Sequence, residues 1–165
     1  MGSFMDELAG SNKELLAEFE QLIGSRFTDL RLLQKALVHS SYAFEQAQAG
    51  QDNQVFEFIG DAVLDLAIGH LLSSRYPEMK EGDLTRFRAS LVNESHLAEI
   101  ARKLDFGRFL FLGKGEDSSN GRYKSSILSS AFEALIGAVF EDSDYNSAAA
   151  LIQNLFERGS DKANG

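Results

Sequence analysis

Apolar residues recur along most of the chain at the three- and four-residue spacing of helices. Residues 11–24 show this pattern in its simplest form, because one apolar stripe faces a polar side. Ser11 and Glu14 stand at capping-box spacing, and Gly24 follows the last apolar residue, as is common where a helix ends. The pattern predicts an amphipathic helix between these two signals.

Two segments are more apolar than a surface helix needs to be, residues 53–74 and residues 126–142. Apolar side chains nearly all round a helix indicate that it is buried. The first of these segments is followed by Pro77, which should stop it. We therefore expect both segments to be central helices of the fold.

The remaining segments complete an all-helical prediction. We expect one helix over residues 29–42, a loop over 43–52, two helices over 81–107, a loop over 112–126 and an amphipathic helix over 145–159. Asp83 is the expected cap of the first helix in 81–107, and Asn93 or Ser95 that of the second. The predicted organisation is one all-α domain over residues 12–158, between a flexible N-terminus, 1–11, and a flexible tail, 159–165.

Composition and charge narrow the range of sites and functions that the chain can have. Cysteine is absent, which excludes disulfides, cysteine zinc sites and thiol nucleophiles. No run of about 18 apolar residues lacks charges, and the N-terminus is not signal-like, so we expect no membrane contact and a cytoplasmic location. The net charge of −9 argues against general adhesion to nucleic acid, except where divalent cations cover the carboxylates. An acidic protein without nucleic-acid contacts fits the same charge.

Three acids stand out because they lie within the two most apolar segments. Glu57 and Asp61 are four residues apart and share a helix face, and Glu133 lies in the other segment. Buried carboxylates are costly unless they are paired, hydrogen-bonded or bound to a metal. If the two helices pack together, the three acids converge on one point, and oxygen-only ligation suits Mg²⁺ or Mn²⁺. Such an ion activates water in phosphoryl hydrolysis.

A structural role is the alternative for these acids. They would then cap loops or pair with Arg86, Arg88 or His39. Asp65 lies two turns after Glu57, and we expect it to face elsewhere and to be structural.

The stretch "NQVFEFIGDAVLDL" resembles the signature of ribonuclease III, which usually reads close to N-E-x-L-E-F-L-G-D-A-V-L. The resemblance continues from about residue 12 to 157. It takes in "ALVHSSY" before the signature and, after it, "RYPEMKEGDLTRFRASLVNESHLAEIARKL", "LGKGEDSSNGRYKSSIL" and "AFEALIGAVFED". On these ordered matches the chain is identified as a member of the ribonuclease III family. We expect a catalytic domain without the double-stranded-RNA-binding domain that often follows, either because the sequence is a fragment or because the protein lacks that domain.

The resemblance implies an all-helical homodimeric endonuclease domain. It would hydrolyse double-stranded RNA with Mg²⁺, or with Mn²⁺ as a substitute, and without a small-molecule cofactor. The products would carry a 5′-phosphate and a 3′-hydroxyl. Precursors of ribosomal RNA and structured messenger RNA are the implied substrates.

The resemblance also assigns residues. Glu57, Asp61 and Glu133 match the acids of the metal site, and Asp61 and Glu133 are the catalytic ones among them. Glu81 matches another acid near the cleavage site. Phe58 matches an aromatic residue that crosses the dimer interface, although an ordinary core aromatic would fit the same position.

Two positions depart from the family pattern. Gln54 replaces the first acid of the signature, beside the cleavage site, and Ser130 stands where the last motif has an aspartate. A serine hydroxyl can hold a metal-bound water but brings no charge, so we expect attenuated activity. A catalytically weak or inactive dimer that binds RNA or protein partners is the alternative function. Arg122 and Lys124 lie in a loop suited to phosphate contact, or they are simply solvated there.

Overall fold

Over residues 2–160, the part of the chain that this computed structural model describes, every regular element is a helix, which confirms the all-α prediction. The elements are α1 (Phe4–Ser11), α2 (Lys13–Ile23), α3 (Leu30–Ala36), α4 (Ser40–Glu45), α5 (Gln54–Arg75), α6 (Glu81–Val92), α7 (Glu94–Lys103), η1 (Phe106–Phe109), α8 (Lys114–Ser118), η2 (Gly121–Tyr123), α9 (Ser125–Asp142) and α10 (Tyr145–Ser160). None of the helices in this part of the chain is long and apolar enough to cross a membrane.

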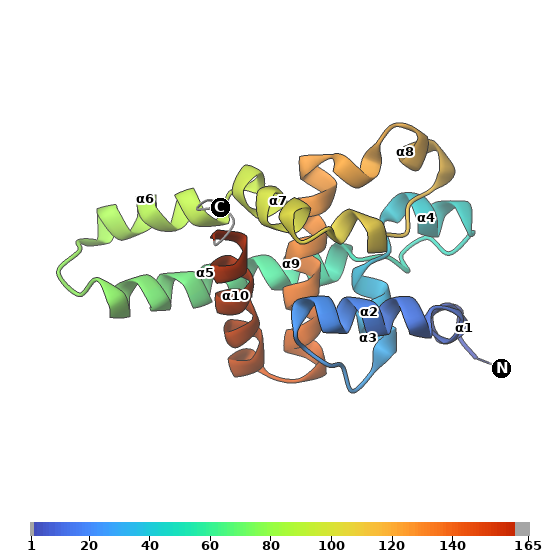
Figure 1. Ribbon diagram of the computed structural model, residues 1–165, viewed down its shortest axis with the longest axis horizontal. Helices are drawn as coiled ribbons and strands as arrows, with labels where there is room; N and C mark the ends of the chain where they lie inside the picture. Colours follow the sequence, from blue (N-terminus) through green and yellow to red (C-terminus); the bar gives the residue numbers. More distant parts are fainter. Residues whose placement is uncertain (1, 161–165) are drawn as a thin grey trace.

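Helix α9 runs through the centre of the fold, with α3, α5, α7 and α10 packed around it (Figure 1). Between Ile127 and Val139, every residue of α9 is buried except Ser130 and Glu133. These two half-buried positions are three apart, so they lie on the same side of the helix. The expected burial of this segment is confirmed, and its two polar exceptions mark one face.

Two glycines let α5 and α9 cross with their backbones in contact. A Cβ atom added to Gly60 would overlap the carbonyl oxygen of Glu133, and one added to Gly137 would overlap the carbonyl oxygen of Phe56. Any larger side chain at either position would force the helices apart. The two central helices therefore meet at a fixed point, one residue from Asp61.

Helix α5 is not buried all round, so that expectation is wrong for one of its faces. Val55, Phe58 and Leu66 are exposed there, and Phe58 is 79% exposed. The neighbouring α6 has no buried residue, and the α5–α6 hairpin extends away from the rest of the domain (Figure 1). The apolar pattern of α5 thus includes surface that this chain alone does not cover.

The N-terminal segment differs from the prediction. Residues 4–11 form α1 instead of a flexible segment, because Met5 and Ala9 are buried and a capping box joins Ser3 to Asp6. The capping box predicted at Ser11 is wrong. Ser11 is instead the last residue of α1, and its hydroxyl donates a hydrogen bond to the Glu7 carbonyl. Helix α2 then begins without a side-chain cap.

The single helix expected over residues 29–42 is two helices. Asp29 caps α3, as its position suggested, but the chain then becomes extended. The backbone N–H of His39 donates to the Phe111 carbonyl, and the Phe111 N–H donates to the Leu37 carbonyl. This pairing with a distant segment separates α3 from α4. Helix α4 extends to Glu45, inside the predicted loop.

Later boundaries follow the prediction more closely. Asn93 caps α7 by accepting a hydrogen bond from the His96 N–H, but Asp83 is no cap, because α6 already begins at Glu81. The loop expected over 112–126 contains the short helices α8 and η2. Helix α10 extends to Ser160, and the rest of the predicted tail, 161–165, lies outside the described residues.

Candidate active site

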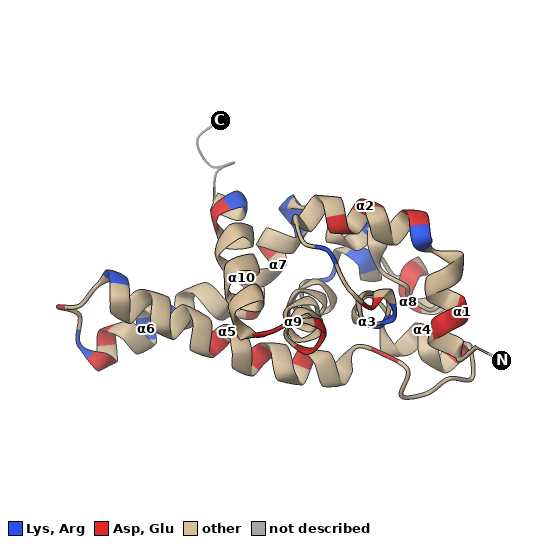
Figure 2. Ribbon diagram, turned by 90° about the horizontal axis from the view of Figure 1, so that it is seen from below, with Lys and Arg blue, Asp and Glu red and all other residues tan. Residues whose placement is uncertain are grey.

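The crossing of α5 and α9 brings the predicted acids together. Glu133 extends from α9 at the level of Gly60, and Glu57 and Asp61 lie on the adjoining turns of α5. Acidic positions along α5 lie beside α9 in Figure 2. The sequence analysis expected the three acids to converge if the two helices pack together, and these helices do pack together.

Ser130 takes part in this cluster instead of facing away from it. Its hydroxyl donates a hydrogen bond to Glu57 Oε1 at 3.1 Å. Ser130 and Glu57 are both half-buried, which strengthens the interaction relative to one in open water. The hydroxyl thus stabilises one carboxylate of the cluster without adding a negative charge.

Glu133 is the most perturbed acid of the cluster. Burial, followed by the charges of Asp61 and Glu57 and a hydrogen bond to Asp61, raises the pKa of Glu133 to about 8. The charge of Asp65 adds the smallest contribution to the same pKa shift. Asp65, which the sequence assigned a purely structural role, therefore lies close enough to affect the cluster.

The acids find no basic partner. No salt bridge among residues 2–160 involves Glu57, Asp61 or Glu133. Arg86 pairs with Asp83, and the His39 ring is hydrogen-bonded to Ser41. The alternative in which Arg86, Arg88 or His39 neutralises these carboxylates is therefore wrong.

The donor set fits a hard divalent cation. It consists of carboxylate oxygens with a serine hydroxyl beside them, which are the ligand types that Mg²⁺ and Mn²⁺ prefer. Within residues 2–160, no group of three or more acidic or histidine side chains is already arranged so that it could hold a metal ion.

Glu81 lies on the far side of a groove between α5 and α6. The groove has a volume of about 440 Å³, and its lining includes Asp65, His70, Glu81 and Arg88. The carboxylate of Glu81 accepts a hydrogen bond from the Thr85 hydroxyl at 2.8 Å. Through Asp65, this groove connects with the acids at the helix crossing.

Gln54 occupies the first position of α5 and is exposed. Its backbone N–H donates to Asp52 Oδ1 at 3.1 Å, and its side-chain amide has no hydrogen-bond partner among the described residues. The position of the first signature acid therefore faces the surface at the start of the helix that carries Glu57 and Asp61.

The two predicted phosphate contacts are engaged within their own loop. The Arg122 guanidinium donates to the carbonyls of Gly107 and Leu110 and pairs with Asp117 at 2.9 Å. Lys124 pairs with Glu116 at 2.9 Å. The Arg122 side chain is therefore more than solvated, whereas the Lys124 side chain remains exposed beside Glu116. A role in RNA binding stays a prediction, and it would compete with these contacts.

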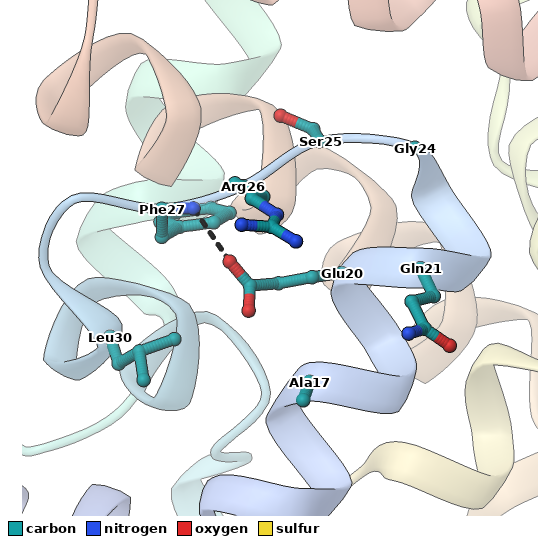
Figure 3. Close-up of a pocket in the computed structure, with 8 residues that line it drawn as sticks. All are labelled: Ala17, Glu20, Gln21, Gly24, Ser25, Arg26, Phe27 and Leu30. Atoms are coloured by element: carbon teal, nitrogen blue, oxygen red, sulfur yellow. Dashed lines mark hydrogen bonds between the residues drawn. The ribbon is translucent and has the colours of Figure 1, made fainter.

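Another cavity, of about 510 Å³, lies at the end of α2 (Figure 3). Glu20 and Arg26 point into it, and Glu20 Oε2 accepts a hydrogen bond from the Phe27 N–H at 2.7 Å. None of its lining residues belongs to α5 or α9. This cavity is thus separate from the acidic crossing.

Comparison with known proteins assigns the arrangement to a family. The sequence profile described as "Ribonuclease-III-like" matches residues 29–158, which include the whole acidic crossing. The chain belongs to the ribonuclease III family. Its membership confirms the resemblance carried by the signature and by the segments on either side of it.

Relatives in this family support the assignment in sequence and in structure. The chain is 62% identical to Ribonuclease 3 of Desulfotalea psychrophila over 94% of its length, and 46% identical to that of Oleidesulfovibrio alaskensis over 86%. It spans 65% and 62% of the length of these two relatives. The crystal structure of the nuclease domain of ribonuclease III from Campylobacter jejuni matches 90% of the chain, at 38% identity and a TM-score of 0.81. The match takes in 96% of that domain.

Proposed function

We propose that this domain is a metal-dependent endoribonuclease that cleaves double-stranded RNA. The observation that carries the proposal is the meeting of Glu57, Asp61 and Glu133 at the close crossing of α5 and α9, with no salt bridge to any of them among residues 2–160. Burial and the neighbouring acids raise the pKa of Glu133 to about 8 there. A perturbed acid cluster of this kind is typical of a working site. Family membership supports the same reaction, because the relatives are named Ribonuclease 3.

The proposed mechanism assigns a role to each acid. Glu57, Asp61 and Glu133 would hold Mg²⁺, for which Mn²⁺ can substitute. When bound, the cation would activate water and stabilise negative charge on the phosphoryl oxygens. The carboxylate of Asp61 or of Glu133 would accept the proton of the attacking water. As the water oxygen bonds to phosphorus, the bond to the 3′ oxygen breaks and that oxygen takes up a proton from solvent, which leaves a 5′-phosphate and a 3′-hydroxyl.

Ser130 and Gln54 set the level of this activity. The Ser130 hydroxyl can hold a water beside Glu57, but its hydrogen bond to Glu57 Oε1 occupies an acceptor site that a cation would otherwise use. Gln54 keeps hydrogen-bonding capacity at the start of α5 without charge. Weaker metal affinity and attenuated cleavage follow from both replacements.

The domain is also proposed to work as a homodimer. Val55, Phe58 and Leu66 form an exposed apolar strip on α5, next to α6, which buries no residue of its own. A two-fold dimer would cover this strip on both subunits at once. Another solved structure of the Campylobacter jejuni nuclease domain, with a TM-score of 0.82, shows structural flexibility in a region involved in dimer formation of that domain. Double-stranded RNA, including ribosomal and messenger RNA precursors, is the proposed substrate of the pair.

A binding function without cleavage is the second candidate. The absence of charge at Ser130 and Gln54 favours a weak or inactive dimer that binds RNA or protein partners. Retention of Glu57, Asp61 and Glu133 in the helix crossing favours the enzyme, since a pure scaffold gains nothing from three neighbouring acids.

Cleavage of defined RNA separates the two functions. A long duplex and either of its single strands are incubated with the protein in Mg²⁺, in Mn²⁺ and in a chelator. The enzyme is expected to cut the duplex only when a divalent cation is present, and to leave 5′-phosphate ends. Duplex binding without cleavage in either cation would establish the alternative.

A further inference from the structure

The groove between α5 and α6 contains an arginine, Arg88, that has no partner among the described residues. Arg88 lines this groove with Asp65 and Glu81. Its side chain makes no hydrogen bond or salt bridge to any residue between 2 and 160, although it is half-buried. A partly desolvated charge without a partner is unfavourable, which points to an anionic ligand.

The absence of a side chain at Gly69 lets the Arg88 guanidinium lie close to α5. A Cβ atom on Gly69 would lie 3.1 Å from Nη1 of Arg88, so the guanidinium rests directly against the surface of α5. Gly69 is one turn after Asp65 and two turns after Asp61 on the same helix. The guanidinium of Arg88, although carried by α6, therefore lies against α5, the helix that carries Glu57 and Asp61.

Other basic residues are less suited to this part of the molecule. Arg86, two residues earlier on α6, pairs with Asp83 and is largely exposed. Arg122 and Lys124 are held by contacts inside their own loop. A phosphate that approached the groove would meet the carboxylates of Asp65 and Glu81, and repulsion would oppose its entry unless a cation were present.

We propose that Arg88 is a positioning residue that binds a backbone phosphate of the RNA duplex beside the acidic crossing. The planar guanidinium donates two parallel hydrogen bonds to the phosphate oxygens and offsets the carboxylates of the groove. This contact fixes the register of the strand on the domain and carries no sequence information. The proposal rests on the proposed ribonuclease function.

The test compares Arg88→Gln with the matched control Arg86→Gln. Binding of a duplex RNA is measured over a series of salt concentrations, in a Glu133→Gln background so that the duplex stays intact, and with Mg²⁺ high enough to offset the remaining carboxylates of the groove. Arg88→Gln should weaken binding roughly tenfold and reduce the slope of log affinity against log salt by about one. Arg86→Gln should leave both quantities close to those of the parent, because its charge is already paired and exposed.

A purely structural role of Arg88 would change stability and not the salt slope. The melting temperature without RNA should therefore stay within a few degrees of the parent, and Arg88→Lys should recover part of the lost affinity. In the active protein, Arg88→Gln should raise KM with a smaller change in kcat. Equal effects of Arg88→Gln and Arg86→Gln on a duplex that the parent protein cleaves would overturn this inference alone. A parent protein that neither binds nor cleaves the duplex would overturn the proposed function and this inference together.

Discussion

The hydroxyl of Ser130 on α9 donates a hydrogen bond to Glu57 Oε1 on α5, at 3.1 Å. This contact spans the helix crossing, and Ser130 is the residue that replaces the aspartate expected in the last motif of the family. It places the departure from the family pattern inside the acidic cluster. Substitutions at Ser130 should therefore act on the site directly.

Ser130→Asp should increase cation-dependent cleavage of duplex RNA by about tenfold, since a gain of about 1.4 kcal/mol in transition-state stabilisation is sufficient. The added carboxylate faces Glu57 and supplies the missing charge for the cation. Without metal, the same carboxylate crowds the cluster and should lower the melting temperature. Ser126→Asp is the matched control, because Ser126 is exposed in the first turn of α9. Unchanged cleavage by Ser130→Asp, with a stability loss that Mg²⁺ does not offset, would remove Ser130 from the metal site.

The stability of the metal-free protein should depend on the protonation of Glu133. Its pKa of about 8 in the folded state lies above the ordinary value of 4.5, so the folded protein retains a proton that the unfolded chain releases. The resulting stabilisation is full below pH 4.5 and is lost as the pH rises to about 8. Melting temperatures in a chelator, from pH 5 to 9, should therefore fall more steeply for the parent protein than for Glu133→Gln. Parallel curves for the two proteins would contradict the raised pKa.

Gly60→Ala should separate the two central helices. The added methyl group would overlap the Glu133 carbonyl, which belongs to the backbone and cannot move independently of α9. Urea unfolding should show a loss of about 3 kcal/mol. Gly10→Ala provides the control, because a Cβ at Gly10 meets nothing within 4 Å. That change should increase stability by about 0.5 kcal/mol. A Gly60→Ala protein as stable as the parent would mean that the backbones do not touch.

Phe58→Ala should weaken the proposed dimer. Phe58 is 79% exposed on α5, and a buried aromatic at a dimer interface commonly contributes about 2 kcal/mol. Light scattering over a concentration series should therefore show a dissociation constant at least roughly tenfold higher than that of the parent. Phe44→Ala is matched in chemistry and in exposure, also at 79%, but lies on α4, and it should leave the dimer intact. A parent protein that stays monomeric at micromolar concentration would refute the dimer itself.

The sequence predicted the central part of the fold because the features involved are local. The bounds expected for α5 lie within one residue of those observed, since its apolar run ends at a tyrosine–proline pair. The role of Asn93 as a cap depended only on the His96 N–H three residues later. The acid pair on α5 followed from helix periodicity in the same way.

Features set by distant contacts were not predictable. Pairing with Phe111 divides the expected helix 29–42, and nothing within that segment signals it. The pattern of α5 did not distinguish burial inside the domain from an exposed apolar strip, because both use the same side chains. Likewise, the spacing of Asp65 on α5 gave no sign that its charge would reach Glu133 on another helix.

The rate of duplex RNA cleavage by the parent protein and by Glu133→Gln, measured side by side in Mg²⁺, decides whether the α5–α9 crossing is the active site. Glutamine keeps the shape of the side chain and removes the charge that would hold the cation. We predict Mg²⁺-dependent cleavage by the parent protein and none by Glu133→Gln, which should remain folded with an equal or higher melting temperature in a chelator. Cleavage by Glu133→Gln at a rate near that of the parent would contradict the assignment of the α5–α9 crossing as the active site.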